Sequence, residues 1–137
     1  MAGARCVKEL VVRAENRVGL VGEIARILSD MGINILAVRV EVVGEEALIH
    51  LLTDAQLYAR DALREAEFPL EEREVVALEL PNRPGFLRRV TEALARQGLD
   101  IHYLYATAAE GSDRSLVVFS CSNNGKAVLM LRERGPR

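Results

Sequence analysis

Side chains alternate along residues 7–14, where one face carries Leu10, Val12 and Ala14. Alternation with a period of two is typical of a strand that has one face in a core. The spacing then becomes helical over the following apolar residues: Leu20, Ile24, Ile27, Leu28 and Met31. The sequence therefore predicts a strand followed by an amphipathic helix near 19–31, which ends at Gly32 because glycine readily closes a last turn.

The next segment predicts a hairpin, a second helix and a further strand. A β-rich run over 33–43 and another over 47–53 flank a short polar turn. Asp54 is the expected N-cap of a helix over 54–66, and residues 68–74 are long enough for a fourth strand. The resulting order, βαββαβ, is that of a ferredoxin-like unit with an antiparallel sheet.

This unit occurs twice in the chain. The segment NRVGLVGEIARILSDMGINI, from Asn16, aligns without gaps with NRPGFLRRVTEALARQGLDI, from Asn82, and ALIHLL later aligns with SLVVFS across a longer turn. Two copies of one supersecondary unit imply two stacked or linked domains. We therefore expect an α+β protein of two tandem ferredoxin-like units, over 1–74 and 75–137, with the second pair of helices near 85–97 and 123–134.

The second copy reaches Arg137 where the first copy begins its fourth strand, so it lacks a last strand. Residues 70–80 contain no Gly, Pro, Asn or Ser, which predicts one strand that runs from the first unit into the second. Residues 75–80 then have either an open edge, which favours a homodimer, or cover from the first repeat's last strand or a bulge. The predicted core comprises Leu10, Val12, Ile24, Leu28, Ile35, Val90, Leu94 and Ile101.

Composition narrows the function classes. The 18 basic and 20 acidic residues are nearly balanced, and no basic run is present, which argues against a nucleic-acid partner. No apolar stretch is long enough for a membrane span or a signal peptide. Cys6 and Cys121 are too few for a disulfide framework, so we expect a cytoplasmic protein.

No group of residues predicts catalysis or a bound metal. His50 and His102 have no second His, Cys or carboxylate at ligand spacing, which argues against a metal site. The sequence also lacks a nucleophile with its base and a phosphate-binding glycine fingerprint. We therefore expect neither an enzyme nor a cofactor.

The repeated motif resembles that of ACT domains. Asn-Arg-Pro-Gly-Phe-Leu at 82–87 precedes a helix that ends in Gly-Leu-Asp-Ile at 98–101, and the first copy has Asn-Arg-Val-Gly-Leu at 16–20 and Gly-Ile-Asn-Ile at 32–35. The resemblance implies a regulatory module that binds a small molecule such as an amino acid. It also implies side-by-side pairing of domains, with ligands at their interface.

The second loop suggests how a ligand binds. Pro84 fixes its own backbone angle, and Gly85 supplies the positive φ that a type II turn needs at its third position. The turn leads into a helix whose first amides and dipole favour a carboxylate. The resemblance implies ligand contacts by the loop Asn and by the residue after the helix-ending Gly. The following residues form the predicted ligand-binding set: Asn16, Gly19, Leu20, Asn34, Asn82, Gly85, Phe86 and Asp100.

The two predicted sites differ. Val18 replaces Pro84, so the first loop is less preorganised, whereas Asp100 replaces Asn34 and would repel a carboxylate or accept an ammonium group. We expect the stronger site on Asn82, Gly85 and Phe86. Asn16, Gly19 and Asn34 form the weaker or alternative site, unless the favourable Asn34 outweighs the looser first turn.

Three functions follow from these observations. The first is a stand-alone regulator that binds an amino acid, and the second is a regulatory subunit of a metabolic enzyme, such as a synthase of branched-chain amino acid biosynthesis. The third and most remote is an acylphosphatase-like enzyme, which needs a loop Arg and a strand Asn on one phosphate.

Overall fold

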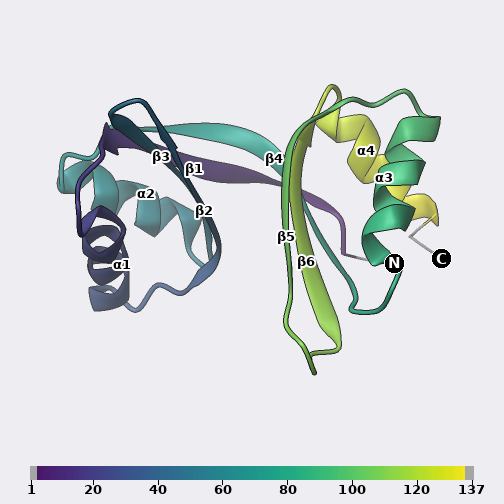
Figure 1. Ribbon diagram of the computed structural model, residues 1–137, viewed down its shortest axis with the longest axis horizontal. Coiled ribbons are helices and arrows are strands. Elements are labelled where there is room, and N and C mark those ends of the chain that lie inside the picture. Colours follow the sequence, from purple (N-terminus) through teal and green to yellow (C-terminus); the bar gives the residue numbers. More distant parts are fainter. Residues whose placement is uncertain (1–2, 135–137) are drawn as a thin grey trace. The chain divides into compact units, whose positions relative to one another are not determined.

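The computed structural model describes residues 3–134 and contains the twice-repeated order of strands and helices (Figure 1). The elements of the first repeat are β1 (Arg5–Glu15), α1 (Leu20–Asp30), β2 (Ile35–Val43), β3 (Glu46–Thr53) and α2 (Gln56–Glu65). Those that follow are β4 (Leu70–Pro81), α3 (Phe86–Arg96), β5 (Ile101–Ala108), β6 (Arg114–Cys121) and α4 (Asn124–Arg134). The two predicted hairpins, the four predicted helices and the strand that runs through residues 70–80 are confirmed.

Residues 8–73 form one compact unit, here called the N-terminal unit. Its strands lie in the order β2–β3–β1–β4, with β3 antiparallel to both β1 and β2. Helices α1 and α2 pack on one face of these strands (Figure 1). The core combines apolar residues from both layers, including Leu10, Ile24, Leu28, Ile49 and Leu63.

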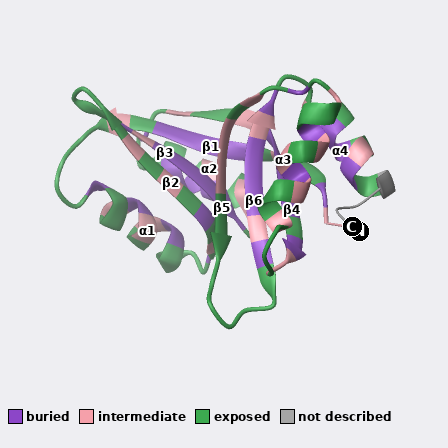
Figure 2. Ribbon diagram, turned by 45° about the vertical axis from the view of Figure 1, so that its right-hand side comes forward, coloured by how far each residue is buried: buried purple, intermediate pink, exposed green. Residues whose placement is uncertain are grey.

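Residues 74–134 and residues 3–7 form the second compact unit, here called the C-terminal unit. Its strand order is β5–β6–β4–β1, and β6 is antiparallel to β4 and β5. Helices α3 and α4 supply one layer of its core. The core includes Leu78, Val90, Leu94, Phe119 and Leu131, and Figure 2 shows the buried positions along one side of each helix.

The first residues of the chain take the place of the missing last strand. The beginning of β1 lies beside β4, and Ala4 is buried in the core of the C-terminal unit. A Cβ on Gly3 would come within 2.7 Å of the backbone oxygen of Glu79, so the two segments are in close contact. The edge that we expected over residues 75–80 is therefore covered. Neither of the covers that we considered supplies it, because the cover comes from the residues that precede and begin β1.

Two predicted core residues are only partly buried. Ile35 and Ile101 pack against their cores but remain partly exposed. In both β2 and β5 the strand register shifts immediately after this isoleucine. A shift of one residue disturbs the alternation of faces, so period-two reasoning places these residues too deep.

The predicted N-cap at Asp54 is wrong. Helix α2 has Ala55 at its N-cap position, while the Asp54 carboxylate accepts a hydrogen bond from the backbone N–H of Asn34 at 2.9 Å. Helix α2 has no side-chain cap, and Gln56, its first residue, instead accepts with Oε1 a hydrogen bond from the Thr53 backbone N–H at 2.7 Å. The side chain of Asp54 thus ties the start of β2 to the end of β3.

Candidate functional site

The two glycine loops have the turn geometry that the sequence predicts. Gly85 has φ 95° and ψ −4°, and Gly19 has φ 89° and ψ −2°. These angles are close to those of the third residue of a type II turn. The Phe86 N–H closes the second turn on the Arg83 carbonyl oxygen at 3.2 Å, and the equivalent bond in the first loop is 3.3 Å. The turn therefore forms in both loops, with proline in one and Val18 in the other.

Each turn presents the uncapped N-terminus of a helix. In α3, the first intrahelical bond runs from the Arg89 N–H to the Gly85 carbonyl oxygen at 3.0 Å. The amides of Leu87 and Arg88 precede this bond, and no side chain in the described part of the chain caps the helix. Free amides together with the positive end of the helix dipole attract anions.

The second loop borders an open hollow of about 580 Å³. The loop and the first turn of α3 form one wall, and the end of β5 with the following turn forms the other. Its charged lining residues are Arg83, Arg88 and Glu110. The Nε of Arg88 pairs with the Glu92 carboxylate at 2.7 Å, so Arg83 is the lining arginine that has no ion pair among the described residues. Half-buried Phe86 adds an apolar surface. The hollow therefore combines a basic rim, free amides and an apolar contact.

Asn82 has a structural role in this loop. Its Nδ2 donates one hydrogen bond to the Ala109 carbonyl oxygen at 3.0 Å and another to that of Ser112 at 2.8 Å. Both amide hydrogens are thereby used to hold the β5–β6 turn. The remaining group, Oδ1, is an acceptor, so Asn82 is suited to contact an ammonium group and not a carboxylate.

The first loop has a different charge distribution. Arg17 forms an ion pair with Glu23 in the first turn of α1, whereas the equivalent residue in α3 is Arg89. An open hollow of about 450 Å³ beside this loop has more acidic than basic lining residues, namely Glu15, Glu46 and Glu67 against Arg13 and Arg17. Acidic residues are therefore in excess around the first loop.

The structure separates the residues of each predicted site. Asn16 lies next to the β2–β3 turn, where its N–H donates to the Glu45 carbonyl oxygen at 2.8 Å. Asn34 lies past the other end of α1, which spans 11 residues, or about 16 Å. Asn82 and Asp100 are likewise at opposite ends of α3. Within one unit, therefore, neither Asn16 and Asn34 nor Asn82 and Asp100 share a site.

The backbones of Asn34 and Asp100 make equivalent contacts. The Asn34 carbonyl oxygen accepts from the Asp54 N–H at 3.0 Å, in addition to the bond between the Asn34 N–H and the Asp54 carboxylate. Asp100 makes the same pair of bonds with Ser122, whose Oγ accepts at 3.0 Å and whose N–H donates at 2.9 Å. These positions thus hold the beginning of each unit's hairpin in place.

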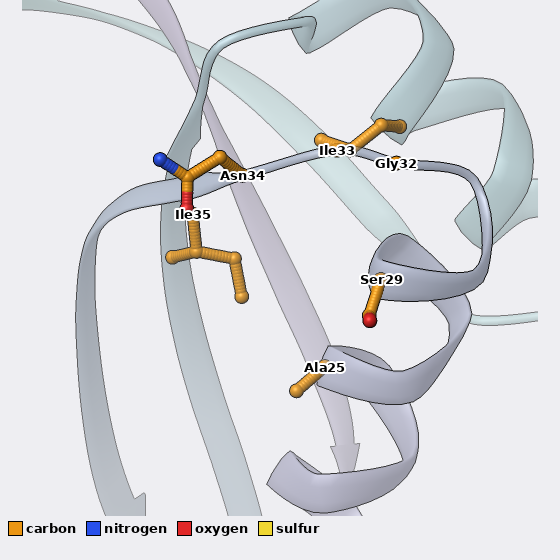
Figure 3. Close-up of a pocket in the computed structure, with 6 residues that line it drawn as sticks. All are labelled: Ala25, Ser29, Gly32, Ile33, Asn34 and Ile35. Carbon is orange, nitrogen blue, oxygen red and sulfur yellow. The ribbon is translucent and has the colours of Figure 1, made fainter.

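A third hollow, of about 380 Å³, lies between α1 and the start of β2. Ala25 and Ser29 of α1 line one side and Asn34 and Ile35 the other (Figure 3). Of the predicted ligand-binding residues, only Asn34 lines this hollow.

One buried polar pair was not predicted from the sequence. Glu9 and His50 are both buried, and Glu9 Oε1 lies 2.9 Å from His50 Nδ1. In the sequence, Glu9 stands directly before the apolar residues of β1, and this position was the available sign that its side chain is buried. In residues 3–134, no group of three His, Cys, Asp or Glu side chains is placed to hold a metal ion.

Comparison with known families agrees with this architecture. The ACT domain model matches residues 8–60, and a model described as an AHAS small subunit-like ACT domain matches residues 77–133. The two matches together cover most of the chain and fall on separate repeats. The chain belongs to the ACT domain family. No curated protein matches the sequence.

Several solved structures share the fold of this chain. Protein BT0572 from Bacteroides thetaiotaomicron is 27% identical, with a TM-score of 0.86 over 96% of this chain and 90% of that chain. The ligand-free regulatory subunit of aspartate kinase from Thermus thermophilus is 15% identical, with a TM-score of 0.66 over 96% of both chains. Aspartate kinase from Synechocystis is also 15% identical, with a TM-score of 0.62 over 96% of this chain and 26% of that chain. The two kinase comparisons establish a common fold.

No helix in the described residues is long and apolar enough to cross a bilayer.

Proposed function

We propose that this chain is a non-catalytic regulatory module that binds an amino acid. Its membership of the ACT family supports this function, and the second loop supplies suitable chemistry. The observation that carries the proposal is the uncapped N-terminus of α3, which opens onto a hollow with a basic rim.

The ligand's two charged groups fit different parts of this hollow. The carboxylate binds at the Leu87 and Arg88 amides, where the helix dipole and the arginine side chains favour negative charge. The ammonium group binds toward Asn82 Oδ1 and the Glu110 carboxylate. The ligand's side chain then contacts Phe86.

The first loop forms the weaker site. Glu23 already provides a negative charge in the first turn of α1 and pairs with Arg17. A ligand carboxylate there would meet a site whose positive charge is largely neutralised. Asn34 and Asp100 lie too far from their own loops to complete these sites within one unit, so their ligand contacts, if made, would require residues of another unit or copy.

A thermal-shift screen against the twenty amino acids tests the proposal. A ligand that binds only the native state stabilises it and so raises the melting temperature. At a free concentration of a hundred times its Kd, the stabilisation free energy is about 2.7 kcal/mol. We expect a shift with at least one amino acid and none with its decarboxylated amine. If no amino acid shifts the melting temperature, the proposed ligand class is wrong.

The second candidate is a regulatory subunit of a metabolic enzyme. The match of residues 77–133 to an AHAS small subunit-like ACT domain favours it. The Thermus thermophilus structure that shares this fold is, by its name, the regulatory subunit of aspartate kinase. The test is to add the purified chain to the synthase of branched-chain amino acid biosynthesis from the same organism. A regulatory subunit would change how strongly the amino acid inhibits that enzyme.

The acylphosphatase-like alternative lacks one of its required parts. It needs a strand asparagine beside the loop arginine, and none of strands β1–β6 contains Asn. Arg17, the loop arginine of the first repeat, is already paired with Glu23.

We also infer that the protein works in the cytoplasm as a homodimer. Cys6 and Cys121 are both free thiols, which suits a reducing compartment. The dimer does not depend on the edge over residues 75–80, because β1 covers it. The contact between the two copies therefore lies elsewhere on the surface.

A further inference from the structure

Strands β1 and β4 each pass from one unit into the other (Figure 1). The boundary between the units falls between Val7 and Lys8 in β1, and between Arg73 and Glu74 in β4. The chain therefore changes unit within two strands and not in a connecting loop. At each of these two crossing points, the strand stops pairing with one unit and continues in the other.

The side chain of Gln56 lies at the crossing point of β1. Its Nε2 donates one hydrogen bond to the Lys8 carbonyl oxygen at 2.7 Å and another to the Leu51 carbonyl oxygen at 3.2 Å. Its Oε1 accepts from the N–H of Thr53 at 2.7 Å and from the Oγ of Thr53 at 2.6 Å. Because Gln56 is the first residue of α2, one carboxamide joins this helix to both β1 and β3.

Asn124 makes the same contact at the crossing point of β4. Its Nδ2 donates to the Glu74 carbonyl oxygen at 2.9 Å, and its Oδ1 accepts from the Cys121 N–H at 2.9 Å. Asn124 is the first residue of α4, as Gln56 is the first residue of α2. The two side chains differ in length by one methylene group, yet each bonds to the crossing strand and to the end of the strand before the helix. Both crossing points thus carry a carboxamide.

In the N-terminal unit, the carboxamide takes the place of the next pair in the β1–β3 ladder. Leu10 pairs with Leu51, so the same antiparallel register places Lys8 opposite Thr53. The carbonyl oxygen of Lys8 and the N–H of Thr53 both point at Gln56, and in an uninterrupted ladder these two groups would bond to each other. The carboxamide is inserted between them and separates the two strands.

The β4–β6 ladder ends in the same way. Val76 pairs with Phe119, so the register places Glu74 opposite Cys121. The carbonyl oxygen of Glu74 and the N–H of Cys121 are joined through the side chain of Asn124. A carboxamide has donors and an acceptor like those of a peptide group, so it satisfies both backbone groups while it holds the strands apart.

We propose that Gln56 and Asn124 are wedge residues that separate the paired strands at the two crossing points. In doing so, they couple the second helix of each unit to the strand that continues into the other unit. Beyond the first wedge, residues 3–7 lie beside β4 and belong to the C-terminal unit. A shift of α2 or α4 would therefore displace the strand where it changes unit. This connection between the units is independent of which ligand the chain binds.

Helix capping does not explain these two side chains. In α4 the cap is the neighbouring Asn123, whose Oδ1 accepts from the Lys126 N–H at 3.0 Å and whose carbonyl oxygen accepts from the Ala127 N–H at 3.1 Å. Helix α2 has no side-chain cap, and Gln56 bonds to strands instead. Asn123 therefore provides a matched control, because it is an adjacent asparagine that supports the helix without a bond to the crossing strand.

Hydrogen exchange of the full-length protein tests the coupling through an effect in the other unit. Gln56→Ala changes the N-terminal unit, and we expect the protected amides of residues 4–7, in the C-terminal unit, to exchange about fivefold faster or more. Asn124→Ala changes the C-terminal unit and should accelerate exchange of residues 70–73, in the N-terminal unit, to a similar extent. Asn123→Ala should leave residues 70–73 unchanged. Circular dichroism checks that each variant is folded.

Effects confined to the unit that carries the substitution would overturn the proposal, as would equal effects of Asn123→Ala and Asn124→Ala on residues 70–73. A measurement on the wild type covers the case of a variant that does not fold. The scalar coupling across the hydrogen bond should connect the Thr53 N–H to the side-chain carbonyl carbon of Gln56. Coupling to the backbone carbonyl carbon of Lys8 would show a closed ladder and contradict the wedge. No ligand is added, so these results are separate from those of the amino acid screen.

Discussion

The Nε of Arg132 donates a hydrogen bond to the carbonyl oxygen of Ala4 at 2.9 Å. The bond joins α4, the last helix, to Ala4, which immediately precedes β1, and both residues belong to the C-terminal unit. This unit is consequently closed by residues from the other end of the sequence. The second ACT repeat depends on them for the strand that its own sequence lacks.

Gly3 tests this arrangement. We expect Gly3→Val to lower the stability of the C-terminal unit by about 1–3 kcal/mol, because a Cβ there would lie 2.7 Å from the Glu79 backbone oxygen and a backbone cannot readily move aside. Thermal unfolding measures the loss of stability, and hydrogen exchange of the β4 amides shows that the loss lies in the C-terminal unit. Gly125→Ala is the control, since its Cβ would have ordinary contact at 3.7 Å, and should change stability by about 0.5 kcal/mol or less. Equal effects of both substitutions would contradict the proposed closure.

The Cys6 thiol reports on the same contact. Partial burial, followed by the charge and hydrogen bond of the Glu74 carboxylate, raises the pKa of Cys6. The thiolate is the reactive form, so Cys6 should be alkylated more slowly than a free cysteine at pH 8. Glu74→Gln should shift the alkylation profile to lower pH and increase the rate. Mass spectrometry separates this signal from that of Cys121, whose pKa is also raised by burial. An unchanged Cys6 profile in Glu74→Gln would contradict the assigned contact.

Asn82 and Asn16 should differ in their effect on folding. Asn82→Ala removes two hydrogen bonds to the β5–β6 turn and should destabilise the protein by about 1–2 kcal/mol without any ligand. Asn16→Ala removes no such pair, and its exposed side chain should contribute about 0.5 kcal/mol or less. Denaturant unfolding of both variants measures the difference. Similar losses would show that Asn82 does not anchor the turn.

The sequence predicted the parts of the fold that depend on local pattern. The repeat located the four helices, and the glycine in each loop predicted the positive φ that Gly19 and Gly85 adopt. The depth of Ile35 and Ile101 could not be predicted by alternation, because each precedes a register shift. Residues 3–7 lie outside the segments that the alignment paired, although at the same spacing they correspond to residues 69–73, which lead into β4 as residues 3–7 lead into β1.

The candidate site was predictable only in part. The turn and the free helix amides follow from Pro84 and Gly85, but the use of Asn82 to hold a hairpin depends on the longer β5–β6 turn. Asn82 and Asp100 are separated because α3 lies between them. They belong to one sequence motif, but the helix places them at different ends of the unit. The alignment places Glu23 opposite Arg89, so the difference in charge between the two loops is present in the sequence. The structure adds that Glu23 forms an ion pair with Arg17.

The most direct test is calorimetry with the amino acid found in the thermal-shift screen, on wild type, Arg89→Glu and Glu23→Arg. These two substitutions exchange the charges at equivalent positions of α3 and α1. One unit charge at 4 Å is worth about 1 kcal/mol in water, so we predict that Arg89→Glu weakens the stronger site roughly fivefold or more. Glu23→Arg should leave that site unchanged and strengthen the weaker one. Unchanged binding to Arg89→Glu, or a loss of the stronger site in Glu23→Arg, would contradict the placement of the ligand carboxylate at the N-terminus of α3.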